Sequence, residues 1–250
     1  MPVESHALTA EQAEQFRRDG FLGPFELCSA AEMRDIRGEL EASVLSKGSP
    51  HLPSNVHQSR HLDKRVVYDL CAHPAVIGRM AGVYGPDLLL WRSNFFQKEP
   101  GAKEIPWHQD MNYWPIEPPV NISAWIAIDE ATLETSCVRL IPGSHKASVP
   151  HVRAEREMQF GEMADPAYVE AERAEPMELR PGQFFLFTER TLHQSEPNRS
   201  DQRRLGLAVR VTVPFVRVES RRLFRGHYNI LVSGEDRAGV NRLGDPPLSA

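Results

Sequence analysis

The stretch RLGLAVRVTV, from Arg204 to Val213, indicates the fold of this chain most clearly. Every second residue in it is large and apolar: Leu205, Leu207, Val209, Val211 and Val213. Because successive side chains of a β-strand point to opposite faces, this alternation predicts a strand with one apolar face. Glycine, alanine, arginine and threonine occupy the other face.

Four earlier segments also have the composition of strands. They are rich in β-branched and aromatic residues and are bounded by proline, glycine or asparagine. These segments are residues 88–99, 120–129, 136–144 and 182–188. Several short strands of this kind favour an antiparallel sandwich or barrel.

The first third of the chain looks helical. Two helices start at capping boxes, in which Thr9 precedes Gln12 and Ser29 precedes Glu32, and a third starts with Pro74 in its first turn. The expected helix ends are Gly20, the region of Leu45, and Gly85. Helices followed by strands indicate the α+β class.

The composition is that of a globular protein, with 41% hydrophobic and 25% charged residues. The net charge of −5 argues against a nucleic-acid-binding surface. Cys28, Cys71 and Cys137 are odd in number and widely spaced, so we expect buried thiols in a reducing compartment. Neither a secretory signal nor a transmembrane stretch is recognisable, and a cytoplasmic protein is expected.

No repeat or linker divides the sequence, so residues 1–250 are expected to form one domain. The helical part covers about 8–85, the strand-rich core about 86–220, and a C-terminal extension 221–250. The acidic segment 147–178 is weakly patterned. A solvated insertion is the preferred interpretation of it, and a mobile excursion over a site is the alternative.

A metal site is indicated by PWHQDMNYWP, residues 106–115. Its His108 and Asp110 are two residues apart and would point to the same side of an extended strand. A third ligand must come from another strand, and His193 follows the apolar segment 184–187 at an expected strand end. Two histidines and one carboxylate form the facial triad of non-haem Fe(II) oxygenases, which leaves positions open for a co-substrate and dioxygen.

A dicarboxylate co-substrate also needs a cation for its far end. Arg204 lies eleven residues after His193, where a hairpin would return it alongside the His193 strand. Its planar guanidinium suits a carboxylate, because the two groups form parallel hydrogen bonds. Arg210 lies further along the same face as Arg204.

Four segments together resemble the phytanoyl-CoA dioxygenase family of Fe(II)/2-oxoglutarate oxygenases. They are LTAEQAEQFRRDGFL, WHQDMNYW, IPGSHK and LHQSEPNRSDQRR, and the similarity runs from about residue 8 to residue 213. The resemblance implies a double-stranded β-helix, or jelly-roll, core with the N-terminal helices packed outside it.

The resemblance also implies roles for single residues. His108, Asp110 and His193 match the iron ligands, and Arg204 matches the 2-oxoglutarate anchor. Ser195, Trp125 and, more weakly, Gln97 match positions that hold 2-oxoglutarate in relatives.

The segment 88–101 resembles the branch of the family that contains carrier-linked aliphatic halogenases. In those enzymes a small residue replaces the carboxylate ligand and makes room for chloride on the iron. Asp110 fills that position here, so we expect hydroxylation or a related oxidation. A halogenase-like enzyme stays as an alternative, as do a non-catalytic metal-binding jelly roll and a cupin-type enzyme without 2-oxoglutarate.

Substrate contacts are expected close to the triad. Asn112, Tyr113 and Trp114 follow it directly and are candidates to line a substrate pocket, with packing at the barrel mouth as the competing interpretation. The expected reaction uses Fe(II), 2-oxoglutarate and O2 to oxidise a C–H bond of a small metabolite in natural-product or amino-acid-type metabolism. A carrier-tethered substrate is a further option, and desaturation, cyclisation or epimerisation could replace hydroxylation.

Overall fold

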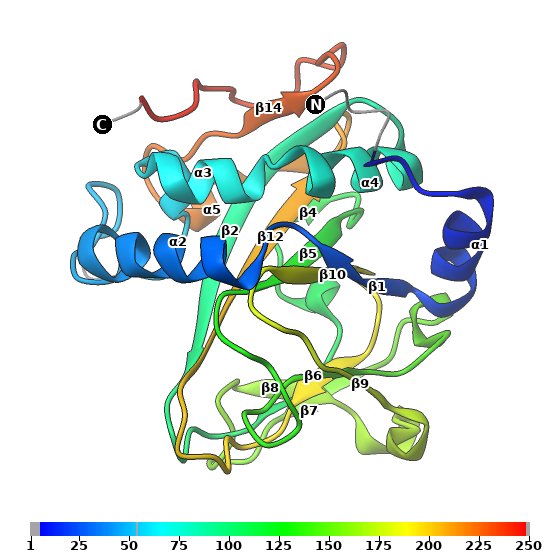
Figure 1. The fold of residues 1–250 in the computed structure, drawn as a ribbon. Coiled ribbons are helices and arrows are strands. Elements are labelled where there is room, and N and C mark those ends of the chain that lie inside the picture. The colour runs from blue at the N-terminus through cyan, green and yellow to red at the C-terminus, as the bar shows by residue number, and fades with distance from the viewer. Residues whose placement is uncertain (1–5, 54, 249–250) are drawn as a thin grey trace.

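The larger of two main sheets is antiparallel and six-stranded in the computed structural model, which describes residues 6–53 and 55–248 (Figure 1). Its central strand β12 pairs with β2 on one side and β5 on the other. In spatial order the strands are β1 (Phe21–Glu26), β10 (Gln183–Thr188), β5 (Ile122–Ala127), β12 (Arg204–Thr212), β2 (Leu88–Lys98) and β14 (Ile230–Ser233).

The second main sheet has four short strands. They are β3 (Ile105–His108), β11 (His193–Ser195), β6 (Val138–Leu140) and β9 (Glu175–Met177). Two small ribbons join β4 (Ile116–Glu117) to β13 (Arg217–Val218) and β7 (His151–Arg153) to β8 (Glu162–Ala164). The expected antiparallel jelly-roll architecture is confirmed.

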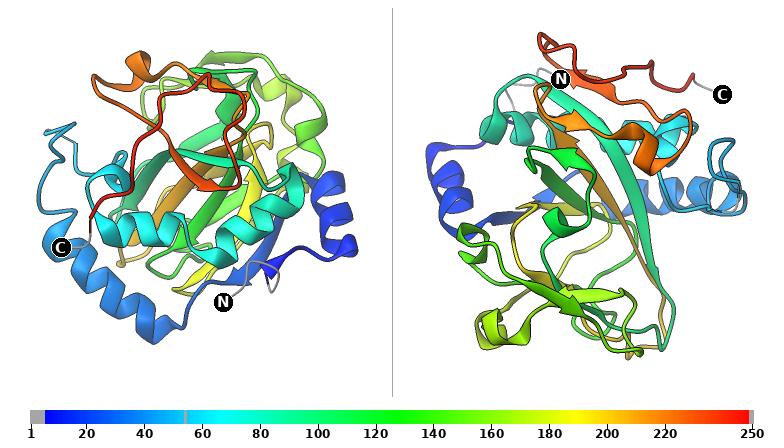
Figure 2. Two further views of the ribbon diagram at one scale, coloured as in Figure 1. Left: turned by 90° about the horizontal axis from the view of Figure 1, so that it is seen from above. Right: turned by 180° about the vertical axis from the view of Figure 1, so that it is seen from behind.

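Helices cover the outer face of the larger sheet, on the side away from the four-stranded sheet (Figures 1 and 2). The α-helices are α1 (Ala10–Asp19), α2 (Ala30–Ser43), α3 (Arg65–Cys71), α4 (Pro74–Tyr84) and α5 (Ser220–Leu223). Short 3-10 turns are η2 (Arg60–Leu62), η3 (Asp110–Asn112), η4 (Ser144–Lys146), η5 (Pro166–Tyr168) and η6 (Ala171–Arg173). No helix in residues 6–53 and 55–248 is long and apolar enough to cross a membrane.

The capping predictions are confirmed. Thr9 and Ser29 each form a capping box with the residue three positions later, and Gly20 ends α1 in the left-handed conformation. The helix that begins with Pro74 ends at Gly85, also as predicted.

The N-terminal part also contains an element that the sequence analysis missed. Residues 21–26 form the edge strand β1, which pairs with β10. Its Gly23 and Pro24 read as turn residues, yet proline is tolerated in an edge strand because one side of that strand needs no hydrogen-bond donors. Helix α3 was missed as well.

The two faces of β12 belong to different interiors. Leu205, Leu207 and Val209 lie in the core shared with α2, α3 and α4. Ala208 lies in a smaller apolar cluster between the two sheets, which also contains Trp125. The small and polar face is therefore buried against the four-stranded sheet, and this inter-sheet space holds the candidate site.

Candidate metal centre and its pocket

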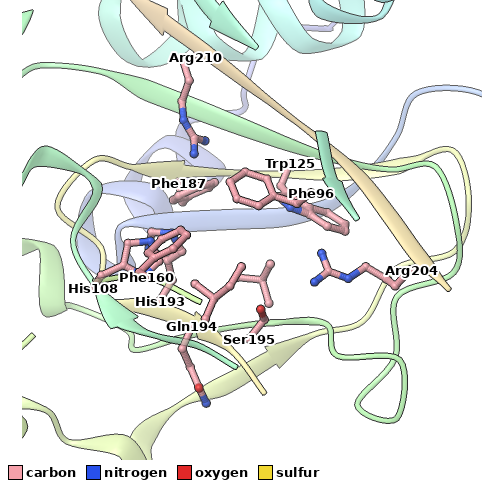
Figure 3. Close-up of a pocket in the computed structure, with 12 residues that line it drawn as sticks. Phe96, His108, Trp125, Phe160, Phe187, His193, Gln194, Ser195, Arg204 and Arg210 are labelled. Carbon is pink, nitrogen blue, oxygen red and sulfur yellow. The ribbon is translucent and has the colours of Figure 1, made fainter. Parts of the chain in front are cut away.

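Three predicted ligand residues meet between the sheets. His108 ends β3, Asp110 opens η3, and His193 opens β11 directly opposite His108 in the antiparallel register. One ligand atom from each residue lies within 4.8 Å of the others, and all three residues are buried. The imidazole centroids are 4.1 Å apart (Figure 3).

Backbone carbonyls orient both imidazoles. The Nδ1 atom of His108 is 2.8 Å from the Pro106 carbonyl oxygen, and that of His193 is 2.9 Å from the Thr191 carbonyl oxygen. Nδ1 therefore donates, and each Nε2 faces Asp110, at 3.7 Å from Oδ1 for His108 and 3.9 Å from Oδ2 for His193. Burial, followed by the nearby His108 imidazole, lowers the pKa of His193 to about 3, so the His193 ring stays neutral as a ligand must.

Asp110 is held ionised by its surroundings. Burial acts to raise its pKa, but the Arg210 guanidinium and both histidines outweigh burial and hold that pKa well below its usual range. Arg210 Nη2 lies 3.2 Å from Asp110 Oδ2. The two groups form an ion pair, but their geometry is not that of a hydrogen bond. The guanidinium also lies over the Trp114 ring at 4.8 Å.

Arg204 points into a small cavity of about 30 Å³ beside the two histidines (Figure 3). Its side chain is buried, and its Nε and Nη2 atoms have no hydrogen-bond partner among the described residues. Burial lowers the pKa of Arg204 to about 10, so the group is still a cation at neutral pH. A buried cation with free donors is a site for an anion.

Trp125 and Ser195, which match 2-oxoglutarate-binding positions of the family, line the same cavity. The Arg204 guanidinium carbon lies 5.1 Å from the Trp125 ring centroid. Gly206 makes this arrangement possible, because a Cβ atom at that position would come within 2.0 Å of the Trp125 indole.

Gln97 does not belong to this pocket, and its prediction needs correction. In the register of β2 and β12, Gln97 pairs with Leu205, whereas Lys98 pairs with Arg204. Since neighbouring residues of a strand face opposite sides, Gln97 shares the face of Leu205. Its amide donates to Glu99 Oε1 at 2.6 Å.

Lys98 occupies the pocket side instead, and the sequence analysis missed it. Its ammonium group is buried and donates to Ser136 Oγ and to the Ser195 carbonyl oxygen, both at 3.0 Å. Lys98 thus ties the end of β11 to β2 and fixes the position of Ser195.

The candidates for substrate contact separate into two groups. Tyr113 and Trp114 line a second cavity, which opens beside Asp110 and Arg210. Asn112 is exposed and donates to Glu162 Oε2 at 3.0 Å, so the structure does not bring it to either cavity.

The segment 147–178 covers the site, contrary to the preferred interpretation of a solvated insertion. Phe160 lines both cavities, and its ring centroid lies 5.0 Å from that of His108. The Tyr113 hydroxyl donates to the Glu162 carbonyl oxygen at 2.9 Å. The segment is an excursion over the candidate metal centre.

Comparison with known proteins gives a consistent result. The profile of the family described as Phytanoyl-CoA dioxygenase (PhyH) matches residues 16–206. Dioxygenase lolE1 of Epichloe uncinata is 34% identical over 136 residues, which cover 54% of this chain and 50% of that protein. Ectoine dioxygenase of Stutzerimonas stutzeri is 29% identical over 174 residues, or 63% of this chain and 57% of that protein. The chain thus spans about half the length of these relatives.

Among solved structures, CytC3 with Fe(II) and alpha-ketoglutarate has a TM-score of 0.76 to this chain at 25% identity. The alignment covers 96% of this chain and 93% of CytC3. The two chains therefore share one fold over almost their whole lengths.

Proposed function

This chain belongs to the phytanoyl-CoA dioxygenase family, and we propose that it is an Fe(II)/2-oxoglutarate-dependent dioxygenase that acts on a small metabolite. One observation carries the proposal. Two imidazoles and one carboxylate converge in a buried space, beside an arginine with two unpartnered donor atoms among the described residues. The first group suits Fe(II), and the second suits the far carboxylate of a dicarboxylate co-substrate.

His108, Asp110 and His193 are the proposed iron ligands. They fit a divalent iron because two imidazole nitrogens and a carboxylate oxygen lie within 4.8 Å of one another, and this is the donor set of the facial triad. For 2-oxoglutarate we assign Arg204, supported by Ser195 and Trp125. Bound iron with 2-oxoglutarate and O2 supplies the oxidising power for a C–H bond, with succinate and CO2 as co-products.

The protein's own residues orient and protect that chemistry. Arg210 holds the Asp110 carboxylate and keeps it ionised. Phe96, Phe160 and Phe187 line the space around the histidines and exclude water from it. The second cavity, beside Asp110, selects which C–H bond of the substrate approaches the metal centre.

Hydroxylation is the proposed outcome rather than halogenation. The Asp110 carboxylate, which is paired with Arg210, occupies the position that chloride would need on the iron. Its negative charge also repels chloride. The same site can also support desaturation, cyclisation or epimerisation.

The test is iron-dependent release of succinate from 2-oxoglutarate in air, measured by NMR. Wild type should release succinate only with Fe(II), and His193→Ala and Asp110→Ala should each lower the rate by about 100-fold or more because a metal ligand is lost. The exposed Arg221→Gln variant is the matched control and should behave as wild type. Absence of iron-dependent succinate from wild type would refute the proposal, and chloride-dependent recovery of Asp110→Ala would favour the halogenase-like alternative.

A further inference from the structure

The second cavity carries information about the substrate. It has a volume of about 430 Å³, within the usual range for small-molecule sites, and shares Asp110 and Arg210 with the candidate metal centre. Because this cavity adjoins the candidate metal centre, the proposed function makes it the substrate site. The inference about the substrate rests on that function.

Arg92 is the unexpected group in this cavity. It lies on β2 directly opposite Arg210 of β12, so both guanidinium groups are on the inter-sheet side. Arg92 is partly buried and lines the cavity. In the part of the chain that the structure describes, it forms neither an ion pair nor a side-chain hydrogen bond; its charged neighbours are Arg210 and Asp110.

The cavity therefore has an excess of one positive charge. Two like charges in directly opposite strand positions destabilise a sheet unless something compensates them. Asp110 compensates Arg210 at 3.2 Å and leaves Arg92 unbalanced. Among the described residues, the lining of the cavity offers Arg92 no second carboxylate. One negative charge on the substrate would restore the balance.

Asn94 provides a second polar contact on the same wall. It lies two residues after Arg92 on β2, hence on the same face, and also lines the cavity. Its Oδ1 atom is buried without a hydrogen-bond partner among the described residues. The Arg92 guanidinium suits a carboxylate, and Asn94 Oδ1 can accept a hydrogen bond from a donor group beside that carboxylate.

We propose that the second cavity binds a small metabolite bearing a single carboxylate, with Arg92 as the residue that recognises this carboxylate. The remainder of the substrate then lies between Arg92 and the metal centre, against Phe96 and Trp114. Arg92 is a specificity-determining residue, and a neutral analogue of the substrate leaves its charge unpaired.

The test compares acids with their neutral amides. Calorimetry measures binding to protein that has been loaded anaerobically with Fe(II) and 2-oxoglutarate. The probes are N-acetyl amino acids with small side chains, such as N-acetylproline and N-acetylvaline, and the corresponding primary amides. For the wild type, the acids should bind at least about tenfold more tightly than the amides, because a charged hydrogen bond is lost with the amide. Arg92→Gln should abolish this preference, Arg92→Lys should keep part of it, and the exposed Arg221→Gln should keep all of it.

The inference is overturned if wild type binds acids and amides with equal affinity, or binds neither. It is also overturned if wild type binds inorganic phosphate more tightly than the acids. A preference that persists in Arg92→Gln also overturns it. The wild-type comparison does not depend on the folding of any variant.

Chelation of Fe(II) by 2-oxoglutarate gives a weak visible metal-to-ligand charge-transfer absorption, and its presence in the same samples separates this inference from the proposed function. If the absorption forms but acids and amides bind equally, the function stands and the substrate inference fails. If it does not form, the function fails, and the acid-to-amide comparison on metal-free protein decides the cavity inference alone. Arg92→Gln should change the affinity for 2-oxoglutarate by no more than about twofold, because Arg204 holds that dicarboxylate.

Discussion

Removing Arg210 should destabilise the metal-free protein far more than the metal-loaded protein. Its guanidinium lies 3.2 Å from the Asp110 carboxylate, and both groups are buried. At an effective dielectric constant of about 20, such a pair is worth about 5 kcal/mol of Coulomb energy. Arg210→Gln removes this attraction and also the cost of burying the arginine, so the expected net loss of unfolding free energy is about 3 kcal/mol.

A divalent metal should replace the missing positive charge. With saturating Ni(II), which binds such a site without turnover, the difference between wild type and Arg210→Gln should fall to about 1 kcal/mol or less, because the metal then compensates Asp110. The assay is urea unfolding followed by circular dichroism, with and without Ni(II). Exposed Arg221→Gln is the control, with an expected change below about 0.5 kcal/mol. A metal-free loss below about 1 kcal/mol, or an equal loss with and without Ni(II), would refute the assigned role of Arg210.

Three further predictions concern stability and access to the site. Burial lowers the pKa of His61 to about 3 and that of His227 to about 4. Between about pH 6.5 and 4, both histidines therefore bind protons in the unfolded chain but stay neutral in the folded chain. Unfolding free energy in EDTA should therefore fall as pH decreases from about 6.5 towards 4, by about 1.4 kcal/mol per pH unit for each histidine, and a flat urea-unfolding profile would contradict this. Gly206→Ala should force Trp125 out of place, lower stability by about 2 kcal/mol in urea unfolding, and weaken 2-oxoglutarate binding in calorimetry; unchanged affinity would count against the role of Trp125. Phe160→Ala should admit water to the metal centre and raise substrate-independent 2-oxoglutarate consumption severalfold with little loss of stability, and an unchanged rate measured by NMR would show that the excursion is not a cover.

Strand periodicity explains why the triad could be predicted. His108 ends β3, Asp110 follows in η3, and His193 comes after the apolar strand β10, so local spacing suggested this set and the family resemblance selected it. Arg204 and Arg210 could likewise be assigned to one face of β12 from alternation alone.

Features that depend on pairing register could not be predicted in this way. Gln97 and Lys98 differ by one position, and only the pairing of β2 with β12 decides which of them faces Arg204. The same register places Arg92 opposite Arg210. Phe160 reaches His108 from a segment without periodicity, so no local pattern in the sequence could reveal that contact.

Anaerobic titration of metal-free protein with Fe(II) and then 2-oxoglutarate tests the central claim most directly. Chelation of iron by the keto acid gives a weak visible metal-to-ligand charge-transfer absorption. The account predicts this absorption in wild type, its loss in His193→Ala, and at least about tenfold weaker 2-oxoglutarate binding in Arg204→Gln, because a charged hydrogen-bonded contact is removed. Iron binding without this absorption in wild type, or full 2-oxoglutarate affinity in Arg204→Gln, would contradict the account.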